Sequence, residues 1–229
     1  MTVSLTMIRS TGRKARAATA RTFLRSVTAT AADILATGDP RTIKECRRIV
    51  HGLTPSGNIG GGLSDPKKMP GKGWGLTALV ACPTGAKLAT HKGTVCSDCY
   101  ACKGNYTFPS VAASLLARFH VVSSASESIE SASLWIAAMV RLISKQSPDV
   151  FRWHDSGDIF SDNYYSMILA VIALTPECDH WIPSKEATRV ALFHGSRASE
   201  AGIPVPANLT LRLSAPVLGR SIRPREDLY

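Results

Sequence analysis

The sequence predicts an α/β domain built from repeated βα units around a mostly parallel sheet, as in a partial TIM-like barrel. Segments with the patterns of strands and helices alternate along the second half of the chain. Polar and ionisable residues of the types found in active sites directly follow the predicted strands. In α/β folds, functional sites lie at these strand ends. With 229 residues, of which 45% are hydrophobic, the chain is long enough to bury a substantial core.

The first 40 residues are expected to form a basic N-terminal arm, followed by a single domain over residues 41–229. The first acidic residue is Asp33, and the basic residues before it are Arg9, Arg13, Lys14, Arg16, Arg21 and Arg25. Such a segment repels itself and attracts phosphate. Three interpretations stay open: a solvated helix face, an arm that contacts nucleic acid, and an organellar transit peptide.

The whole chain is basic, with 27 lysine and arginine residues against 17 acidic residues and a net charge of +10. This balance favours an anionic partner such as nucleic acid or a phosphorylated nucleotide, although a basic protein without such a partner has the same composition. No apolar run approaches the roughly 18 residues of a membrane span, so no membrane partner is expected. The chain also begins without an apolar secretory core, so we expect its six cysteines to stay reduced in a cytoplasm.

The first half of the chain contains one predicted helix, one loop and one strand. Thr42 or Asp39 can cap a short helix that places Cys46 on its buried side. Residues 51–75 contain eight glycines and three prolines and are therefore expected to form a loop. The apolar run 76–81 has the length and composition of a short buried strand.

The second half alternates between helices and strands. Pro109 suits the first turn of a helix, the sequence Ser124–Glu127 has the form of a capping box before the clearest amphipathic pattern of the chain, and Ser161 can cap a third helix. We expect helices over about 109–122, 127–146, 161–175 and 185–194, and strands over about 150–154, 179–183 and 208–213.

Residues 82–106 contain four of the six cysteines, and the rest of the chain is expected to support this segment. Three of these cysteines are separated by two residues each, a spacing that brings the sulfurs onto one tight loop where they can meet one ion or cluster. Thiolates at this density normally bind zinc or an iron–sulfur centre. The predicted ligands are Cys82, Cys96 and Cys99, with Cys102 or His91 as the fourth. Cysteines with a purely structural function are the alternative.

A second cluster, His154-Asp155-Ser156-Gly157-Asp158, lies at the end of the predicted strand 150–154. In a loop that contains Gly157, both carboxylates can point into a cleft above the sheet. Lys185 and Arg212 belong to the next two strand ends and are expected on the same rim. The structural alternative is a core histidine followed by aspartates that cap the next helix.

These residues suggest a division of roles in an enzyme site. Asp155 and Asp158 are predicted acid/base or substrate-orienting groups, assisted by His154. Lys185 and Arg212 are predicted to hold phosphate. The other predicted substrate contacts are Ser156, Gly157 and Tyr106.

The combined pattern resembles the gene-product-eighty-eight family of bacteriophage proteins, common in actinobacteriophages. The resemblance runs from about Trp74 to Gly219. It is carried by Cys82, Cys96, Cys99, Tyr100, Ala101, Gly104, Tyr106, His154, Ser156, Gly157, Asp158, Phe160, Ser161 and Lys185. The resemblance implies a second cysteine-rich segment after the fourth strand, whereas this chain ends at Tyr229, so we expect a shortened or split member.

Two wider resemblances concern the reaction. The order of cysteines, Ser-Gly-Asp and Ser-Lys at successive strand ends is similar to the early half of a radical S-adenosylmethionine barrel, in which three cysteines hold a 4Fe–4S cluster. Here 13 residues separate the first two cysteines, where that superfamily usually has three. The sequence Asp155-Ser156-Gly157 resembles a short motif of the transglycosylases that exchange guanine for 7-deazaguanine bases and carry a structural zinc.

We therefore expect a phage-encoded, metal-dependent enzyme that acts on a nucleic acid or nucleotide in the host cytoplasm, with a 4Fe–4S cluster and S-adenosylmethionine or with zinc. One alternative is a base-modifying enzyme of the 7-deazaguanine transglycosylase type. Another is a non-catalytic protein in which four cysteines close a zinc site and basic residues bind nucleic acid.

Overall fold

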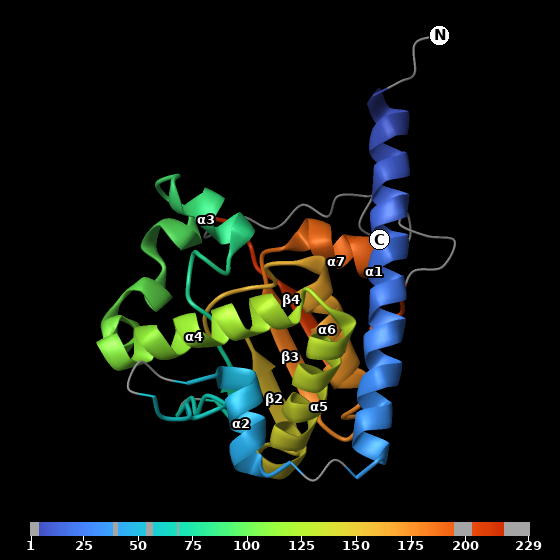
Figure 1. Ribbon diagram of the computed structural model, residues 1–229. Helices are drawn as coiled ribbons and strands as arrows, with labels where there is room; N and C mark the ends of the chain where they lie inside the picture. The colour runs from blue at the N-terminus through green and yellow to red at the C-terminus, as the bar shows by residue number, and fades with distance from the viewer. Residues whose placement is uncertain (1–4, 39–40, 54–56, 68, 195–202, 218–229) are drawn as a thin grey trace.

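A computed structural model describes residues 5–38, 41–53, 57–67, 69–194 and 203–217 of the chain. Figure 1 shows how its elements are arranged. The helices are α1 (Leu5–Ala36), α2 (Ile43–His51), α3 (Pro83–Ala89), α4 (Pro109–Ala125), α5 (Ile129–Gln146), α6 (Asp162–Ala173) and α7 (Ala187–His194). The strands are β1 (Lys72–Trp74), β2 (Val150–Trp153), β3 (Asp179–Ser184) and β4 (Leu209–Leu213), and three short 3-10 helices lie between Val95 and Thr107.

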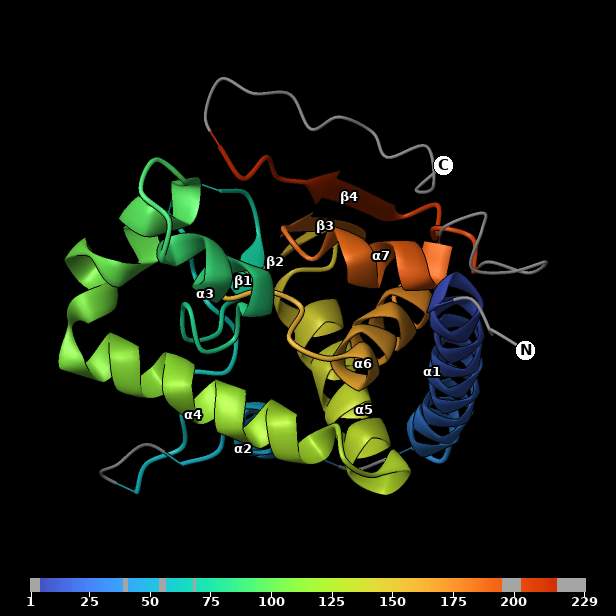
Figure 2. The same ribbon diagram turned by 90° about the horizontal axis from the view of Figure 1, so that it is seen from above.

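The four strands form one parallel sheet in the order β1-β2-β3-β4. Alternate residues of β2 and β3 are buried, and the residues between them are less buried. Helices α5 and α6 lie against the sheet, and α1 packs beside both of them (Figures 1 and 2). The predicted α/β class with a parallel sheet is therefore confirmed. Within the described residues the sheet is open, with β1 and β4 as its edges.

The first strand lies earlier in the chain than the sequence pattern indicated. The paired residues are those of β1, whereas the apolar run 76–81 contains turns, with Leu79 in the left-handed region at a φ of 64°. Leu76 and Ala81 are fully buried, so the run is apolar because this loop packs into the core. The prediction of a strand here is wrong because a short apolar run does not distinguish a buried strand from other buried segments.

Side-chain caps account for the start of three helices. Thr42 caps α2 in a capping box with Glu45, and Ser161 caps α6, both as predicted. The predicted capping box at Ser124–Glu127 is wrong, because α4 extends through the first two residues of that motif. Ser128 caps α5 instead, by accepting a hydrogen bond from the helix backbone.

The basic N-terminal segment forms the long helix α1, whose first turns extend beyond the rest of the domain (Figure 1). Its later turns join the common core through Ala17, Ala20, Val27 and Ala31. Arg16 also pairs with Asp162 at the start of α6, where its Nη2 donates to Oδ1 at 2.7 Å. The side chain of Arg9 lies outside the described part of the chain. Neither α1 nor any other described helix is long and apolar enough to cross a membrane.

Three buried histidines make the fold sensitive to acid. His51, His154 and His180 are 2%, 3% and 1% exposed, and burial lowers their pKa values from 6.5 to about 4, about 3 and about 4. The Nδ1 atom of His51 accepts the N–H of Gly62 at 3.2 Å, and that of His180 accepts the indole N–H of Trp153 at 3.2 Å. Protonation at Nδ1 would break these contacts.

The free energy of unfolding is therefore expected to fall by several kcal/mol as the pH is lowered from about 6.5 to about 4, since each unit of pKa shift corresponds to about 1.4 kcal/mol. The folded state binds fewer protons than the unfolded chain in this window, so the histidine contribution is complete above pH 6.5 and is lost on acidification. Burial raises the pKa values of Asp155 and Asp158, which act in the opposite sense as the pH falls toward 3.8.

Urea unfolding at about pH 7 and about pH 5 measures this effect. Asparagine in place of His180 is expected to reduce the difference, whereas asparagine in place of the exposed His91 is not. Equal stabilities of the wild-type protein at the two pH values would contradict the prediction.

Candidate functional site

A cavity of about 230 Å³ lies at the carboxyl ends of the strands. The cysteine segment, the loop after β2 and the ends of β3 and β4 form its walls. Eight of the residues predicted from the sequence line this cavity: Cys82, Cys96, Cys99, His154, Ser156, Gly157, Asp158 and Lys185. They meet because a parallel sheet brings the ends of all its strands to one edge. Cys99 and Asp158 therefore lie at the same end of the sheet, as the predicted arrangement requires.

Two strand ends fix the chain beside Cys82. In the loop after β2, the backbone N–H of Asp158 donates to the carbonyl of Ala81 at 3.0 Å. After β3, Oε1 of Glu186 accepts the N–H of Thr84 at 2.6 Å. The first turn of α3 has free N–H groups, and the carboxylate of Glu186 satisfies one of them. Cys82 is thus held between contacts to two neighbouring parts of the sheet.

The chain after β4 holds the segment near Cys96. The N–H of Val95 donates to the carbonyl of Pro216 at 3.0 Å, and Thr94 forms an isolated antiparallel bridge with Val217. Because Cys96 follows directly, its position depends on the end of β4, more than a hundred residues away in the sequence.

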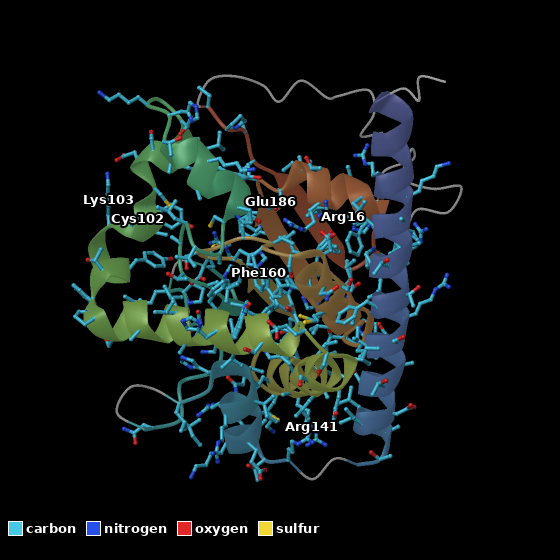
Figure 3. The ribbon with its side chains drawn as sticks, turned by 45° about the horizontal axis from the view of Figure 1, so that its top comes forward. Arg16, Cys102, Lys103, Arg141, Phe160 and Glu186 are labelled. Carbon is cyan, nitrogen blue, oxygen red and sulfur yellow. The ribbon has the colours of Figure 1, made fainter. Side chains whose placement is uncertain are left out.

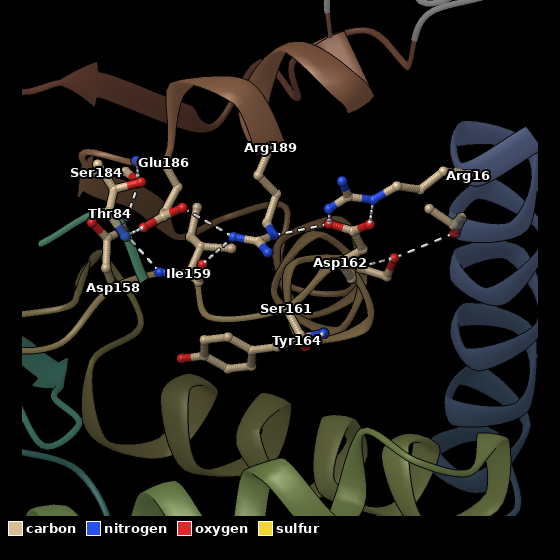
Figure 4. A network of polar contacts seen from close by, with 12 residues as sticks. Arg16, Thr84, Asp158, Ile159, Ser161, Asp162, Tyr164, Ser184, Glu186 and Arg189 are labelled. Atoms are coloured by element: carbon tan, nitrogen blue, oxygen red, sulfur yellow. Dashed lines mark hydrogen bonds and ion pairs between the residues drawn. The ribbon is translucent and has the colours of Figure 1, made fainter. Parts of the chain in front are cut away.

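An ionic network extends across the domain from Glu186, whose carboxylate binds the first turn of α3 (Figure 4). Oε2 of Glu186 pairs with Arg189 at 3.1 Å, and Nε of Arg189 pairs with Asp162 at 2.9 Å. Asp162 also binds Arg16. The network therefore links the start of α3 through α7 and α6 to the basic helix α1.

Cys82 and Cys96 both lie close to Gly85 in α3. A Cβ atom at Gly85 would lie 3.5 Å from Sγ of Cys96 and 3.8 Å from Sγ of Cys82, so the glycine keeps the space beside the two sulfurs open. Burial, together with the nearby Asp158 and the thiols of Cys99 and Cys96, raises the pKa of the Cys82 thiol to about 12. Burial also raises the pKa of Cys96, whereas the charge of Lys185 lowers it. A soft metal cation would stabilise these thiolates, so the donor set fits such an ion.

The two candidates for a fourth ligand do not line this cavity. Cys102 is exposed beside Lys103 at the outer margin of the molecule (Figure 3), and burial together with the neighbouring Cys99 raises the pKa of its thiol. His91 is exposed, with Nδ1 3.0 Å from the carbonyl oxygen of Lys87. Across the described ranges, no three side chains of His, Cys, Asp or Glu stand in an arrangement that could hold a metal ion. Metal binding here would require the cysteine side chains to turn toward one point.

Asp158 is a buried anchor between two loops. Its Oδ1 accepts hydrogen bonds from Oγ of Ser184 at 2.6 Å and from the N–H of Ile159 at 2.8 Å, and its Oδ2 accepts the N–H of Lys185 at 2.8 Å. Burial raises the pKa of Asp158, and these hydrogen bonds oppose the rise. The carboxylate therefore fixes the end of β3, and with it Lys185, relative to the loop after β2.

His154 is buried and lines the cavity with an incompletely bonded ring. Its φ of 56° lies in the left-handed region, which is uncommon for a residue other than glycine. Nε2 lies 3.0 Å from the hydroxyl of Tyr164, while the buried Nδ1 has no hydrogen-bond partner in the described structure. Because burial lowers its pKa to about 3, the ring is neutral near pH 7 and can offer one nitrogen to a ligand.

The structure separates the two aspartates of the motif, contrary to the expectation of a shared cleft. Asp155 and Tyr106 line a second cavity, of about 650 Å³. Gly75 permits this placement, because a Cβ atom there would lie 1.9 Å from Oδ1 of Asp155. The carbonyl of Asp155 accepts hydrogen bonds from the hydroxyls of Tyr100 and Tyr106, the latter at 3.3 Å. Since Tyr100 lines the first cavity, the two tyrosines form a wall between the cavities.

The cations at the two cavities differ from those predicted. Arg212 is exposed on β4 and does not line the first cavity, whereas Ser214 does. Arg152, to which the sequence pattern assigned no role, lines the first cavity with its Cζ 4.8 Å from the ring centre of Trp181. Arg118, which was also not predicted, is 5% exposed and lines the second cavity. An arginine on the apolar side of a helix was the signal that could have identified Arg118.

Comparison with known proteins gives one family and no individual relative. No curated protein and no solved structure matches the chain. The family model described as Gene product 88 matches residues 36–218, which include both cavities and all the predicted site residues. The chain therefore belongs to the gene product 88 family.

Proposed function

We propose that the first cavity is the active site of a metal-dependent enzyme that acts on a nucleic acid or a nucleotide. One observation carries the proposal: three thiols, a neutral histidine, a buried aspartate and two cations from separate parts of the chain line one small cavity. The pKa values of Cys82, Cys96, His154 and Asp158 are shifted by burial, and such a concentration of ionisable groups is typical of functional sites. The net charge of +10 favours an anionic substrate.

Cys82, Cys96 and Cys99 are the residues that would hold the metal. Their sulfur atoms suit zinc or an iron–sulfur cluster, and Gly85 keeps space open beside two of them. When bound, a 4Fe–4S cluster would supply the radical chemistry of S-adenosylmethionine enzymes, and zinc would supply a Lewis acid. The raised pKa values of the Cys82 and Cys96 thiols mean that metal binding there releases protons.

The other residues of the cavity would bind and orient the substrate. Lys185 and Arg152 provide positive charge for an anionic group. Asp158 fixes the backbone of Lys185, so it acts mainly as a positioning residue. His154 is neutral and can form one further hydrogen bond through Nδ1.

A zinc-stabilised protein that binds nucleic acid without catalysis is the second candidate. It is favoured by the interaction of Cys102 with Cys99 and Cys96, which brings a fourth sulfur close to two of the other three. Four thiolates complete a tetrahedral zinc site and leave no position for a substrate. The transglycosylase alternative has less support, because its motif residue Asp155 lines the cavity that contains none of the four cysteines.

Replacement of Lys185 by methionine tests the enzyme proposal. Expression of the wild-type protein is expected to introduce modified nucleosides, detected by mass spectrometry of digested host nucleic acid. The variant should lower their level at least about 10-fold, because a charged hydrogen bond contributes about 1.5–3 kcal/mol. Lys87→Met removes an exposed charge from α3 and is expected to leave the level unchanged. Unaltered nucleosides in wild-type cells, with normal nucleic-acid binding and a colourless zinc-containing protein, would favour the second candidate.

A further inference from the structure

The second cavity contains a buried arginine whose hydrogen-bonding capacity is only partly used. Nη1 of Arg118 donates to Oγ of Ser64 at 2.7 Å and lies 3.5 Å from the carbonyl oxygen of Gly75. Its Cζ lies 5.0 Å from the ring centre of Trp74. Nε is buried, and within the described residues it has no hydrogen-bond partner. Because a guanidinium carries five N–H donors, this side chain can bind a further acceptor.

The charge of Arg118 is also unpaired at close range. Over the parts of the chain that the structure describes, no carboxylate lies within 4.0 Å of its nitrogen atoms. Burial lowers the pKa of Arg118 to about 10, although the more distant charge of Asp155 opposes this shift. A buried cation without a paired anion is costly. An anion in the cavity would compensate this cost.

The rest of the lining offers donors that suit such an anion. They are the hydroxyl groups of Ser64, Ser110 and Ser114, the amide of Asn105 and the ammonium group of Lys67. The carboxylate of Asp65 also lines the cavity and pairs with Lys72 at 2.9 Å. A guanidinium surrounded by hydroxyl and amide groups matches the several oxygen atoms of a phosphate. A volume of about 650 Å³ leaves room for a sugar as well as the phosphate.

We propose that the second cavity binds a phosphate group of the substrate, with Arg118 as its buried cation. This inference rests on the proposed action on a nucleic acid or nucleotide. The phosphate would lie across the tyrosine wall from the cysteines, so the reacting part of the substrate and its phosphate would occupy separate cavities. Arg118 takes the place that Arg212 was expected to fill.

Substitution of Asp155 distinguishes phosphate binding from a purely structural interaction between Arg118 and Asp155. Its carboxylate lines the same cavity and repels an anion there. Phosphate binding therefore predicts opposite effects: neutral residues at position 118 weaken the affinity, and a neutral residue at position 155 strengthens it. A purely structural interaction predicts that both changes lower stability and that neither alters phosphate binding.

Calorimetric titration of the purified protein with inorganic phosphate, and with a nucleoside 5′-monophosphate against the matching nucleoside, provides the test. The monophosphate is expected to bind more tightly than the nucleoside. Arg118→Gln is expected to weaken phosphate binding about 10- to 100-fold, the equivalent of one charged hydrogen bond. Asp155→Asn is expected to strengthen it about 3- to 10-fold.

Two further variants make the test independent of any folding defect that Arg118→Gln causes. Ser110→Asp adds a charge at an exposed lining position in the first turn of α4, where an acid is compatible with the helix, and is expected to weaken phosphate binding about 3- to 10-fold. Lys145→Gln, at the exposed end of α5, controls for net charge and is expected to have no effect.

The proposal would be overturned if the nucleoside and its monophosphate bound with equal affinity. It would also be overturned if Arg118→Gln and Lys145→Gln lowered the affinity for phosphate equally. The measurement needs neither metal nor turnover. A failure to bind phosphate is therefore distinct from a failure of the proposed enzyme, which is judged by metal content and by modified nucleosides.

Discussion

Serine in place of both Cys96 and Cys99 is expected to reduce the bound metal from about one site per chain to almost none, because soft metals need thiolate rather than hydroxyl ligands. The double variant is also expected to lose several kcal/mol of stability. Metal binding at thiolate sites contributes on the order of 10 kcal/mol, and part of this is folding free energy when the ligands lie on a loop. The cysteine segment has only the short helix α3 and three short 3-10 helices of its own, and it depends on contacts with the strand ends.

Metal analysis of anaerobically purified protein measures the first effect, and thermal unfolding with and without a chelator measures the second. The matched control replaces Cys46 and Cys178 by alanine. Both are buried away from the cavity, so this variant is expected to lose stability while it retains its metal. The metal assignment fails when the Cys96/Cys99 variant and the wild-type protein contain the same amount of metal.

Asp158→Asn is expected to destabilise the protein by about 2–4 kcal/mol, although it changes only one atom. The carboxylate accepts three hydrogen bonds, two of them from the backbone N–H groups of Ile159 and Lys185. An amide has one oxygen, so in either orientation its NH₂ group faces one of these N–H donors. Leaving a buried donor without an acceptor carries its full desolvation cost.

Asp155→Asn is the matched control, because Oδ1 of Asp155 accepts the N–H of Ser156 at 3.0 Å, and an amide oxygen can accept the same hydrogen bond. We expect a cost below about 1 kcal/mol for this change. Urea unfolding at about pH 7 compares the two variants. Similar stabilities for both would contradict the anchoring role of Asp158. The contrast also explains why Lys185, rather than Asp158, is the better position at which to test chemistry.

The pattern of elements could be predicted from the sequence wherever the signal is local. Ser161 caps α6, and the strands β2, β3 and β4 lie within a residue or two of the predicted ranges. These predictions succeed because caps and short apolar patterns depend on neighbouring residues. The strand expected over residues 76–81 fails because its apolar residues serve a buried loop, and burial alone does not specify backbone conformation.

The composition of the first cavity could also be anticipated, since it follows from topology. Alternating strands and helices predict a parallel sheet, and a parallel sheet brings the residues after each strand to one edge. Cys82, Cys99 and Asp158 meet there for this reason. The sequence by itself thus determined the α/β class, the family and half of the residues that line this cavity.

Only the tertiary structure decided how the polar groups divide between the two cavities. Asp155 and Asp158 are three residues apart, yet the path of the loop and the missing side chain of Gly75 place them in different cavities. Arg118 comes from a helix in which its neighbours are apolar, and its proximity to Asp155 arises from packing between distant segments. Such placements depend on contacts between residues far apart in the chain, and no local pattern of residue types encodes them.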